Sequence, residues 1–318
     1  MSDEPKPPES APLPPPTTAL VKRESTEPVE LRLADSLESA GRGTFVHIDG
    51  KGQVRSPARY RVMTALAYGL SGGAILASTL LYVDIFGPLG GLVGLVLGGA
   101  FAIGVRRGRR MIRAAALVQS ERLAEAEQLC TETLAGRFVP RRLRAAAHQN
   151  LAAIATRRGQ FEAALDHVRK AIQLRHSALR PKNVLVDILA YAEVTLLVNL
   201  GRVGEARTRL EARGMVPDGD FLRVQHWTAD LYVQFAERRL TLDEDGLWER
   251  ANAALRITGA AHLLALCSWG YTVRVDEDMS QHLLEQAIDR AEPSTAITFP
   301  SLWRWVEERR ALKQPSTD

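Results

Sequence analysis

The sequence is poor in the residues and motifs that build catalytic or metal sites. It contains two cysteines, Cys130 and Cys267, in 318 residues, and they lie far apart and outside any CxxC or Cys/His cluster. This excludes a disulfide scaffold and a zinc ribbon. The seven histidines are scattered, and neither an HExxH motif nor a GxxxxGKS/T motif is present. We therefore expect no catalytic residue, no bound metal and no cofactor.

Charge is missing from one long part of the chain. The sequence has 41 Lys and Arg against 37 Asp and Glu, but between Val62 and Val105 the one formally charged residue is Asp84. This distribution excludes a simple soluble globule. The pI of about 9.2 is basic, but no nucleic-acid recognition motif accompanies it, so we do not expect nucleic-acid binding.

The charge-poor part consists of two apolar runs, at 62–83 and 85–105. As helices, each would span about 30 Å, the thickness of a bilayer's hydrocarbon core. Asp84, Gly87 and Pro88 lie between them and suit a tight turn at the bilayer surface. The pattern predicts a two-span transmembrane hairpin within 59–110, and a lipid bilayer as one partner.

Arginines flank both runs, while the turn between them has no Lys or Arg. The flanking set is Arg59, Arg61, Arg106, Arg107, Arg109 and Arg110. Positive residues favour the cytoplasmic side, so we expect both chain ends in the cytoplasm and the turn outside. We expect a multi-pass protein of a bacterial inner membrane, whose arginines lie near lipid headgroups.

Small residues recur at helical spacing in both runs, at Gly69 and Gly73 and then at Gly90, Gly94 and Gly98. Such stripes let two helices approach closely in lipid. We expect these faces to meet within the hairpin. A stripe that drives homo-oligomerisation is the alternative.

The segment before the hairpin, 1–58, has eight prolines among its first thirty residues. Proline removes a backbone donor, and few apolar side chains are present to offset the entropy of ordering. We expect a disordered or weakly ordered tail. It is either a solvated spacer or a docking segment for a proline-binding module.

Residues 111–312 show amphipathic helix pairs, clearest over 150–174. Two helices are predicted there, with Gly159 at the turn between them. Weaker pairs are expected at 114–135, 184–213, 221–257 and 260–291, and a last helix near 302–312 is expected to cap the stack through Trp303 or Trp305. We predict an all-α fold: a two-helix transmembrane hairpin followed by an α-solenoid, with a proline-rich tail.

The clearest pair resembles the tetratricopeptide repeat (TPR) family. The residues that match the family pattern are Asn150, Leu151, Gly159, Phe161, Ala164 and Ala171. The family's closing proline is absent. The resemblance implies a solenoid whose concave face binds a peptide or protein segment. It places groove positions at Gln149, Asn150, Ala153 and Arg157, with Tyr191 from the next repeat.

Together these features predict a non-catalytic, membrane-anchored scaffold that recruits or assembles protein partners at the cytoplasmic face. The alternative is a subunit of an oligomeric membrane complex, assembled through the glycine-rich spans, in which the repeats are regulatory.

Overall fold

A computed structural model describes residues 47–48, 54–55, 88–175, 184–214, 216–217, 219–256 and 260–312. Apart from one antiparallel ladder of two-residue strands, β1 (His47–Ile48) and β2 (Val54–Arg55), all regular secondary structure in these residues is helical, which confirms the all-α class. The predicted first span, 62–83, and most of the predicted tail lie outside the described residues.

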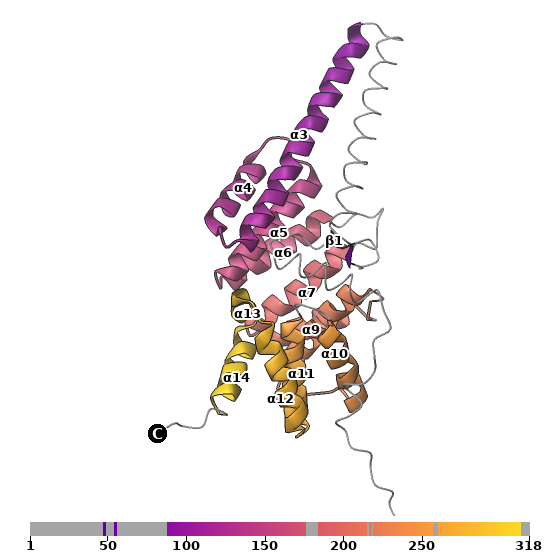
Figure 1. Cartoon of the computed structure of the whole chain (residues 1–318). Coiled ribbons are helices and arrows are strands. Elements are labelled where there is room, and N and C mark those ends of the chain that lie inside the picture. The colour runs from indigo at the N-terminus through magenta and orange to yellow at the C-terminus, as the bar shows by residue number, and fades with distance from the viewer. Residues whose placement is uncertain are drawn as a thin grey trace, which may run out of the picture.

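Ten of the described helices form five successive antiparallel pairs (Figure 1). The pairs are α3 (Pro88–Gln119) with α4 (Leu123–Ala135), α5 (Arg141–Arg157) with α6 (Phe161–Arg175), α7 (Val184–Asn199) with α8 (Val203–Glu211), α9 (Asp220–Ala236) with α10 (Glu244–Arg256), and α11 (Ala261–Val273) with α12 (Glu277–Asp289).

The first helix of every pair ends in the same backbone turn. One residue in each turn has a left-handed φ: Glu121 (59°), Gly159 (70°), Gly201 (73°), Arg238 (53°) and Val275 (65°). The next residue's N–H donates to the carbonyl five residues back, as Gln160 N donates to Ala155 O at 2.9 Å and Asp276 N donates to Tyr271 O at 3.0 Å. This is the Schellman ending of a helix, which pairs carbonyls that would otherwise lack a partner.

The second helix of each pair begins with an acidic residue in its first turn, where the positive end of the helix dipole favours it. These residues are Glu125, Glu162, Glu205, Glu244 and Glu277. The repetition of both the turn and the acidic start shows that the five pairs are variants of one unit.

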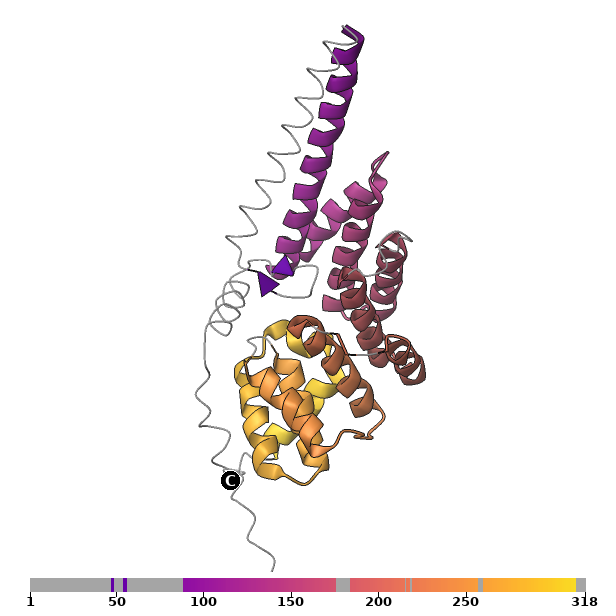
Figure 2. The same cartoon turned by 90° about the vertical axis from the view of Figure 1, so that its right-hand side faces the viewer.

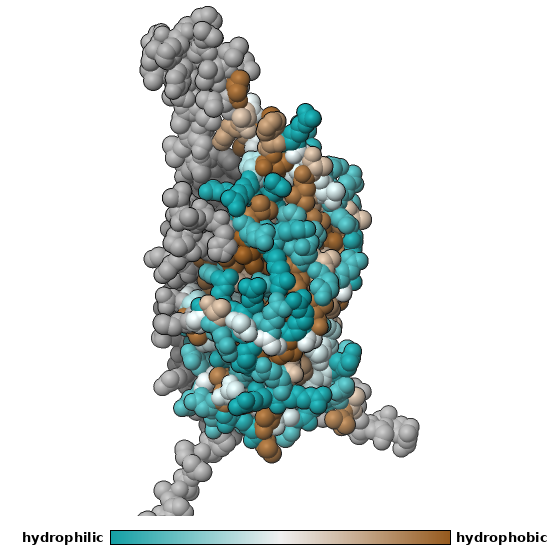
Figure 3. All heavy atoms as spheres, turned by 180° about the vertical axis from the view of Figure 1, so that it is seen from behind, coloured by the Kyte–Doolittle hydropathy of each residue, from teal (hydrophilic) through white to brown (hydrophobic). Residues whose placement is uncertain are grey.

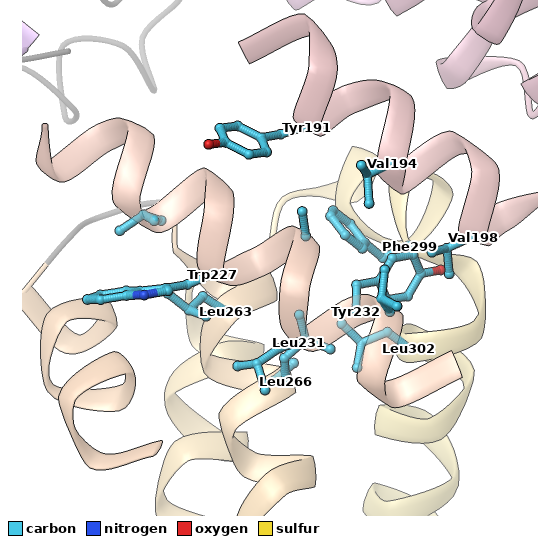
Figure 4. Close-up of a cluster of buried hydrophobic side chains, with 14 of the residues drawn as sticks. Tyr191, Val194, Val198, Trp227, Leu231, Tyr232, Leu263, Leu266, Phe299 and Leu302 are labelled. Atoms are coloured by element: carbon cyan, nitrogen blue, oxygen red, sulfur yellow. The ribbon is translucent and has the colours of Figure 1, made fainter. Parts of the chain in front are cut away.

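The pairs stack in chain order. Each second helix packs against the first helix of the next pair, and first helices also pack on one another, as α3 on α5, α7 on α9 and α9 on α11. Two apolar clusters hold the stack together: a smaller one between α3, α4 and α5, and a larger one from α5 to the C-terminal helices. Figure 4 shows part of the larger cluster, where Leu263 of α11 lies beside Trp227 of α9 and Leu266 of α11 lies beside Leu231 of α9.

Two further helices, α13 (Pro293–Thr298) and α14 (Pro300–Ala311), follow the last pair. Both begin with proline at a position where the missing N–H costs nothing. They turn back along the stack: α13 packs on α5 and α14 packs on α11 (Figures 1 and 2).

The N-terminal half of α3 projects beyond every other described helix (Figures 1 and 2). Most of the predicted second span, 85–105, falls in this half. Among the residues that the structure describes, no helix is both long enough and apolar enough to cross a membrane.

Candidate interaction surface

The first helices of the pairs expose one side away from their second helices, and we call this side the inner surface. On α9 the two sides are clearly separated. Asp230 accepts a hydrogen bond at 2.6 Å from Arg250 of α10, so this face is turned toward the second helix. Because each helical residue advances by about 100°, Tyr232 and Phe235 emerge on the opposite face. They belong to the inner surface.

The C-terminal helices lie on this inner surface. Asn199, at the end of α7, donates from Nδ2 to the carbonyl oxygen of Thr298 at 2.9 Å. The hydroxyl of Tyr232 donates to Asn199 Oδ1 at 2.6 Å and lies 2.9 Å from Ser301 Oγ. With α13 on α5 and α14 on α11, the segment 293–311 reaches the first helices of four consecutive pairs.

Phe299, between α13 and α14, is the central apolar contact of this segment. Its ring lies 4.8 Å from the ring of Tyr232, edge to face, and 4.0 Å from the ring of His262. Figure 4 shows Phe299 directed toward Tyr232, with Leu302 beside them. The side chain of Phe299 is 5% exposed and Leu302 is fully buried, so the hydrophobic effect is the main attraction.

Polar contacts fix the position of α14. Trp303 Nε1 lies 3.5 Å from His262 Nδ1 and donates to it. Burial lowers the pKa of His262 to about 3, so the ring is neutral and its Nδ1 accepts. Farther along, Arg309 Nη2 donates to Thr272 Oγ1 and to Glu277, each at 3.0 Å.

The groove residues predicted from the sequence lie in different surroundings. Gln149 accepts from Arg175 of α6 at 3.0 Å, and Asn150 donates to the carbonyl of Met111 in α3 at 3.2 Å. Arg157 is paired with Glu121 of the preceding turn. Ala153 is exposed, and Tyr191 is buried against His226 of α9, with ring centroids 5.6 Å apart.

The membrane-flanking and glycine predictions fall partly outside the described residues, which include neither Arg59, Arg61, Gly69 nor Gly73. Arg106 and Arg109 are exposed on α3, while Arg107 and Arg110 are half-buried. Gly90, Gly94 and Gly98 belong to α3, and a Cβ added at Gly98 would meet none of the described part of the chain within 4 Å.

The structure also brings together two histidines that the sequence keeps apart. Nδ1 of His148 on α5 lies 3.1 Å from Nδ1 of His167 on α6. The ring centroids are 5.3 Å apart, and at this Nδ1–Nδ1 distance one ring donates the hydrogen that the other accepts. Desolvation lowers both pKa values. No group of three or more His, Cys, Asp or Glu side chains in the described ranges is placed to hold a metal ion.

Both thiols are buried and inert as nucleophiles. Burial raises the pKa of Cys130 to about 11 and that of Cys267 to about 12. At neutral pH each is therefore a protonated thiol that packs in the core.

Comparison of the chain with protein-family models, with curated proteins and with solved structures finds no match. The fold itself defines the class: a stack of antiparallel helix pairs whose inner surface is covered in part by the chain's own C-terminal helices.

Proposed function

We propose that this chain is a non-catalytic, membrane-anchored, TPR-like scaffold that recruits or assembles protein partners at the cytoplasmic face. The observation that supports this most is the repeated unit: five helix pairs with the same left-handed turn and the same acidic start to the second helix. A stack of such units offers a long inner surface for a peptide or protein segment.

The proposed anchor is a two-span hairpin, 62–83 and 85–105, in a bacterial inner membrane, with both chain ends cytoplasmic. Its support is the apolar sequence, the flanking arginines and the continuity of α3. This helix runs without a break from Pro88 into the first pair, where Met111 and Leu117 are buried. A continuous helix would hold the repeats at a fixed height above the bilayer.

The partner would bind the part of the inner surface that the C-terminal helices leave open. On α5, the exposed face around Ala153 is such a place, with Gln149 and Arg157 one turn to either side. Alanine leaves room for a backbone to approach, and a bound segment would compete with Arg175 for the amide oxygen of Gln149 and with Glu121 for the guanidinium of Arg157.

The test compares two alanines that are both exposed. Ala153→Arg would fill the inner face of α5, whereas Ala163→Arg places the same side chain on α6. Full-length protein would be crosslinked in its membrane and the captured partners compared. We expect the first substitution to remove partners that the second leaves. Equal recovery with both variants would contradict the proposed surface.

A second arm tests the anchor. If the full-length chain is extracted from membranes by alkaline carbonate without detergent, the proposed hairpin is not embedded and that part of the proposal fails.

The alternative, a subunit assembled through glycine-rich helices, is favoured by Gly98 and Gly99 on the projecting part of α3, where an added Cβ would meet no atom of the described residues within 4 Å. Gly98→Leu would then abolish crosslinked oligomers while the repeats keep their partners. Unchanged oligomers would leave the scaffold as the better proposal.

A further inference from the structure

The turn between α4 and α5, residues 136–140, displays an aromatic side chain in full contact with solvent. Phe138 is 96% exposed, and its φ of 57° is left-handed, a conformation that L side chains rarely adopt. Both features cost free energy in a soluble turn. Val275, in the turn between α11 and α12, shares both features, so it is the surroundings of Phe138 that single it out.

Arg107 of α3 fixes this turn. Its Nη1 donates to the carbonyl of Phe138 at 3.1 Å, and its Nη2 donates to the carbonyl of Arg137 at 3.2 Å. One planar guanidinium thus binds two successive carbonyl oxygens. These bonds hold the backbone of the turn in the conformation that exposes the ring of Phe138.

The turn lies beside α3 at the foot of its projecting half. Arg107 follows the charge-free stretch of α3, which ends at Val105. Seen from behind, hydrophobic residues are exposed on the projecting end of α3 (Figure 3), and they include Val96 at 60% and Ile103 at 53%. Phe138 is thus placed at the level where the apolar stretch gives way to arginines.

Arginines are numerous in the turn that carries Phe138 and in the part of α3 that lies beside this turn. Between residues 136 and 144 there are four arginines and no Asp or Glu: Arg137, Arg141, Arg142 and Arg144. Exposed Arg106, Arg109 and Arg113 belong to the adjacent part of α3. Among the described residues, no carboxylate lies within ion-pair distance of these seven arginines. Deeper in the stack, Arg169 and Arg250 do pair with acids, at 2.8 and 2.6 Å.

We infer that this arginine-rich turn, residues 136–144, is a second membrane contact, made with the headgroups of anionic lipids. The inference rests on the proposed membrane anchor. Phe138 enters the headgroup region, and the arginines around it bind lipid phosphates, which a guanidinium matches with paired hydrogen bonds. Two separate contacts, α3 and this turn, fix the tilt of the repeat stack over the bilayer.

The chain offers a matched control. Val275, in the turn between α11 and α12, is also apolar, exposed (82%) and left-handed (φ 65°), but it lies at the other end of the stack. Full-length Phe138→Cys and Val275→Cys would each carry an environment-sensitive NBD label, since the two native cysteines are buried. The labelled chains would be reconstituted into nanodiscs of phosphatidylcholine alone or mixed with phosphatidylglycerol.

We expect the label at position 138 to brighten several-fold, and to shift to the blue, in nanodiscs that contain phosphatidylglycerol. It should be quenched by headgroup-level spin-labelled lipid, and high salt should reverse the change because it screens the arginines. The label at 275 should respond in neither lipid. A variant in which Arg137, Arg142 and Arg144 are all replaced by Gln should lose the fluorescence response of the label at 138, while its circular-dichroism spectrum stays helical.

Equal signals from the two labels in every lipid would overturn the inference. So would a response at 138 to duplex DNA but not to anionic nanodiscs, which would make the turn a nucleic-acid contact. Carbonate extraction tests the anchor separately. If carbonate extracts the chain, the fluorescence of the label at 138 is measured after anionic vesicles are added. A fluorescence change then supports the lipid contact of the turn, and an unchanged signal contradicts it.

Discussion

At the scale of single residues, the five turns within pairs show how one backbone shape is built from different amino acids. Glycine provides the left-handed position in two turns, at Gly159 and Gly201. Glu121, Arg238 and Val275 provide it in the other three, where the side chain opposes that conformation. The Schellman hydrogen bonds and the packing of the flanking helices must therefore stabilise these three turns enough to hold the strained φ.

This difference predicts a stabilising substitution. Val275→Gly should raise the free energy of unfolding by about 1 kcal/mol, because a β-branched residue leaves a strained φ and its side chain is mostly exposed. Gly159→Ala, in the equivalent turn of α5 and α6, should lower it by a similar amount. Urea denaturation of both variants measures this, and a loss of stability in Val275→Gly would contradict the shared-turn account.

The same turns show what the sequence could and could not reveal. Gly159 and Gly201 were visible as turn signals, so the two pairs around them were predicted from residue type. Arg238 and Val275 carry no such signal, and the pairs around them rested only on helix length and amphipathicity. The contact of His148 with His167 depends on how α5 and α6 pack, which the scattered histidines did not show.

His262 gives the inner surface a pH dependence with a defined sign. Its pKa is about 3 in the folded chain and about 6.5 when unfolded. The unfolded state therefore binds more protons below pH 6.5. The contribution of neutral His262 to the free energy of unfolding is complete above that pH. It is lost as the pH falls toward 3, by at most about 1.4 kcal/mol per pH unit.

His262→Asn should flatten this slope between pH 6.5 and 4, since asparagine keeps an acceptor for Trp303 but does not titrate. Unfolding midpoints measured across that range give the slope. His282→Asn, on the exposed side of α12, is the control and should leave it as in the native chain. Identical slopes for native protein and His262→Asn would show that this ring does not control acid stability.

At the scale of helices, the C-terminal pair shows a limit of sequence reading. A final helix near 302–312 was predicted as a cap, and α14 (Pro300–Ala311) is there, with Trp303 buried against His262. The placement of α13 on α5 had no sequence signal. It depends on contacts between distant residues, such as Asn199 with Thr298 and Tyr232 with Ser301.

These contacts predict a local release. Phe299→Ala removes the most buried aromatic of the segment, a change that costs about 3–5 kcal/mol in a rigid core. Because the segment can undock instead, we expect hydrogen exchange over 293–311 to speed up while the first pairs stay protected. Ile297→Ala is the control, since Ile297 is 39% exposed on α13. Uniform loss of protection along the whole chain would show that α13 and α14 are inseparable from the core.

At the scale of the whole molecule, two regions of the stack differ in the residues that cover their surface. The end near the projecting half of α3 carries exposed arginines and Phe138. Part of the inner surface from α5 to α11 is covered by α13 and α14. A partner that needs the covered face must displace a tethered competitor, whose short connection from α12 gives it an effective concentration of roughly millimolar.

Binding in trans tests this competition. A chain that ends at residue 291 should bind a synthetic peptide of residues 292–312, because the peptide restores contacts with Tyr232 and His262. The native chain, whose own segment occupies the face, should not bind it at micromolar concentrations. A peptide with Phe299→Ala should fail on the shortened chain, and helical circular dichroism of that chain checks that it remains folded. Equal binding of the peptide by native and shortened chains would show that the peptide occupies another surface. In that case α13 and α14 would not be what limits access to the inner surface.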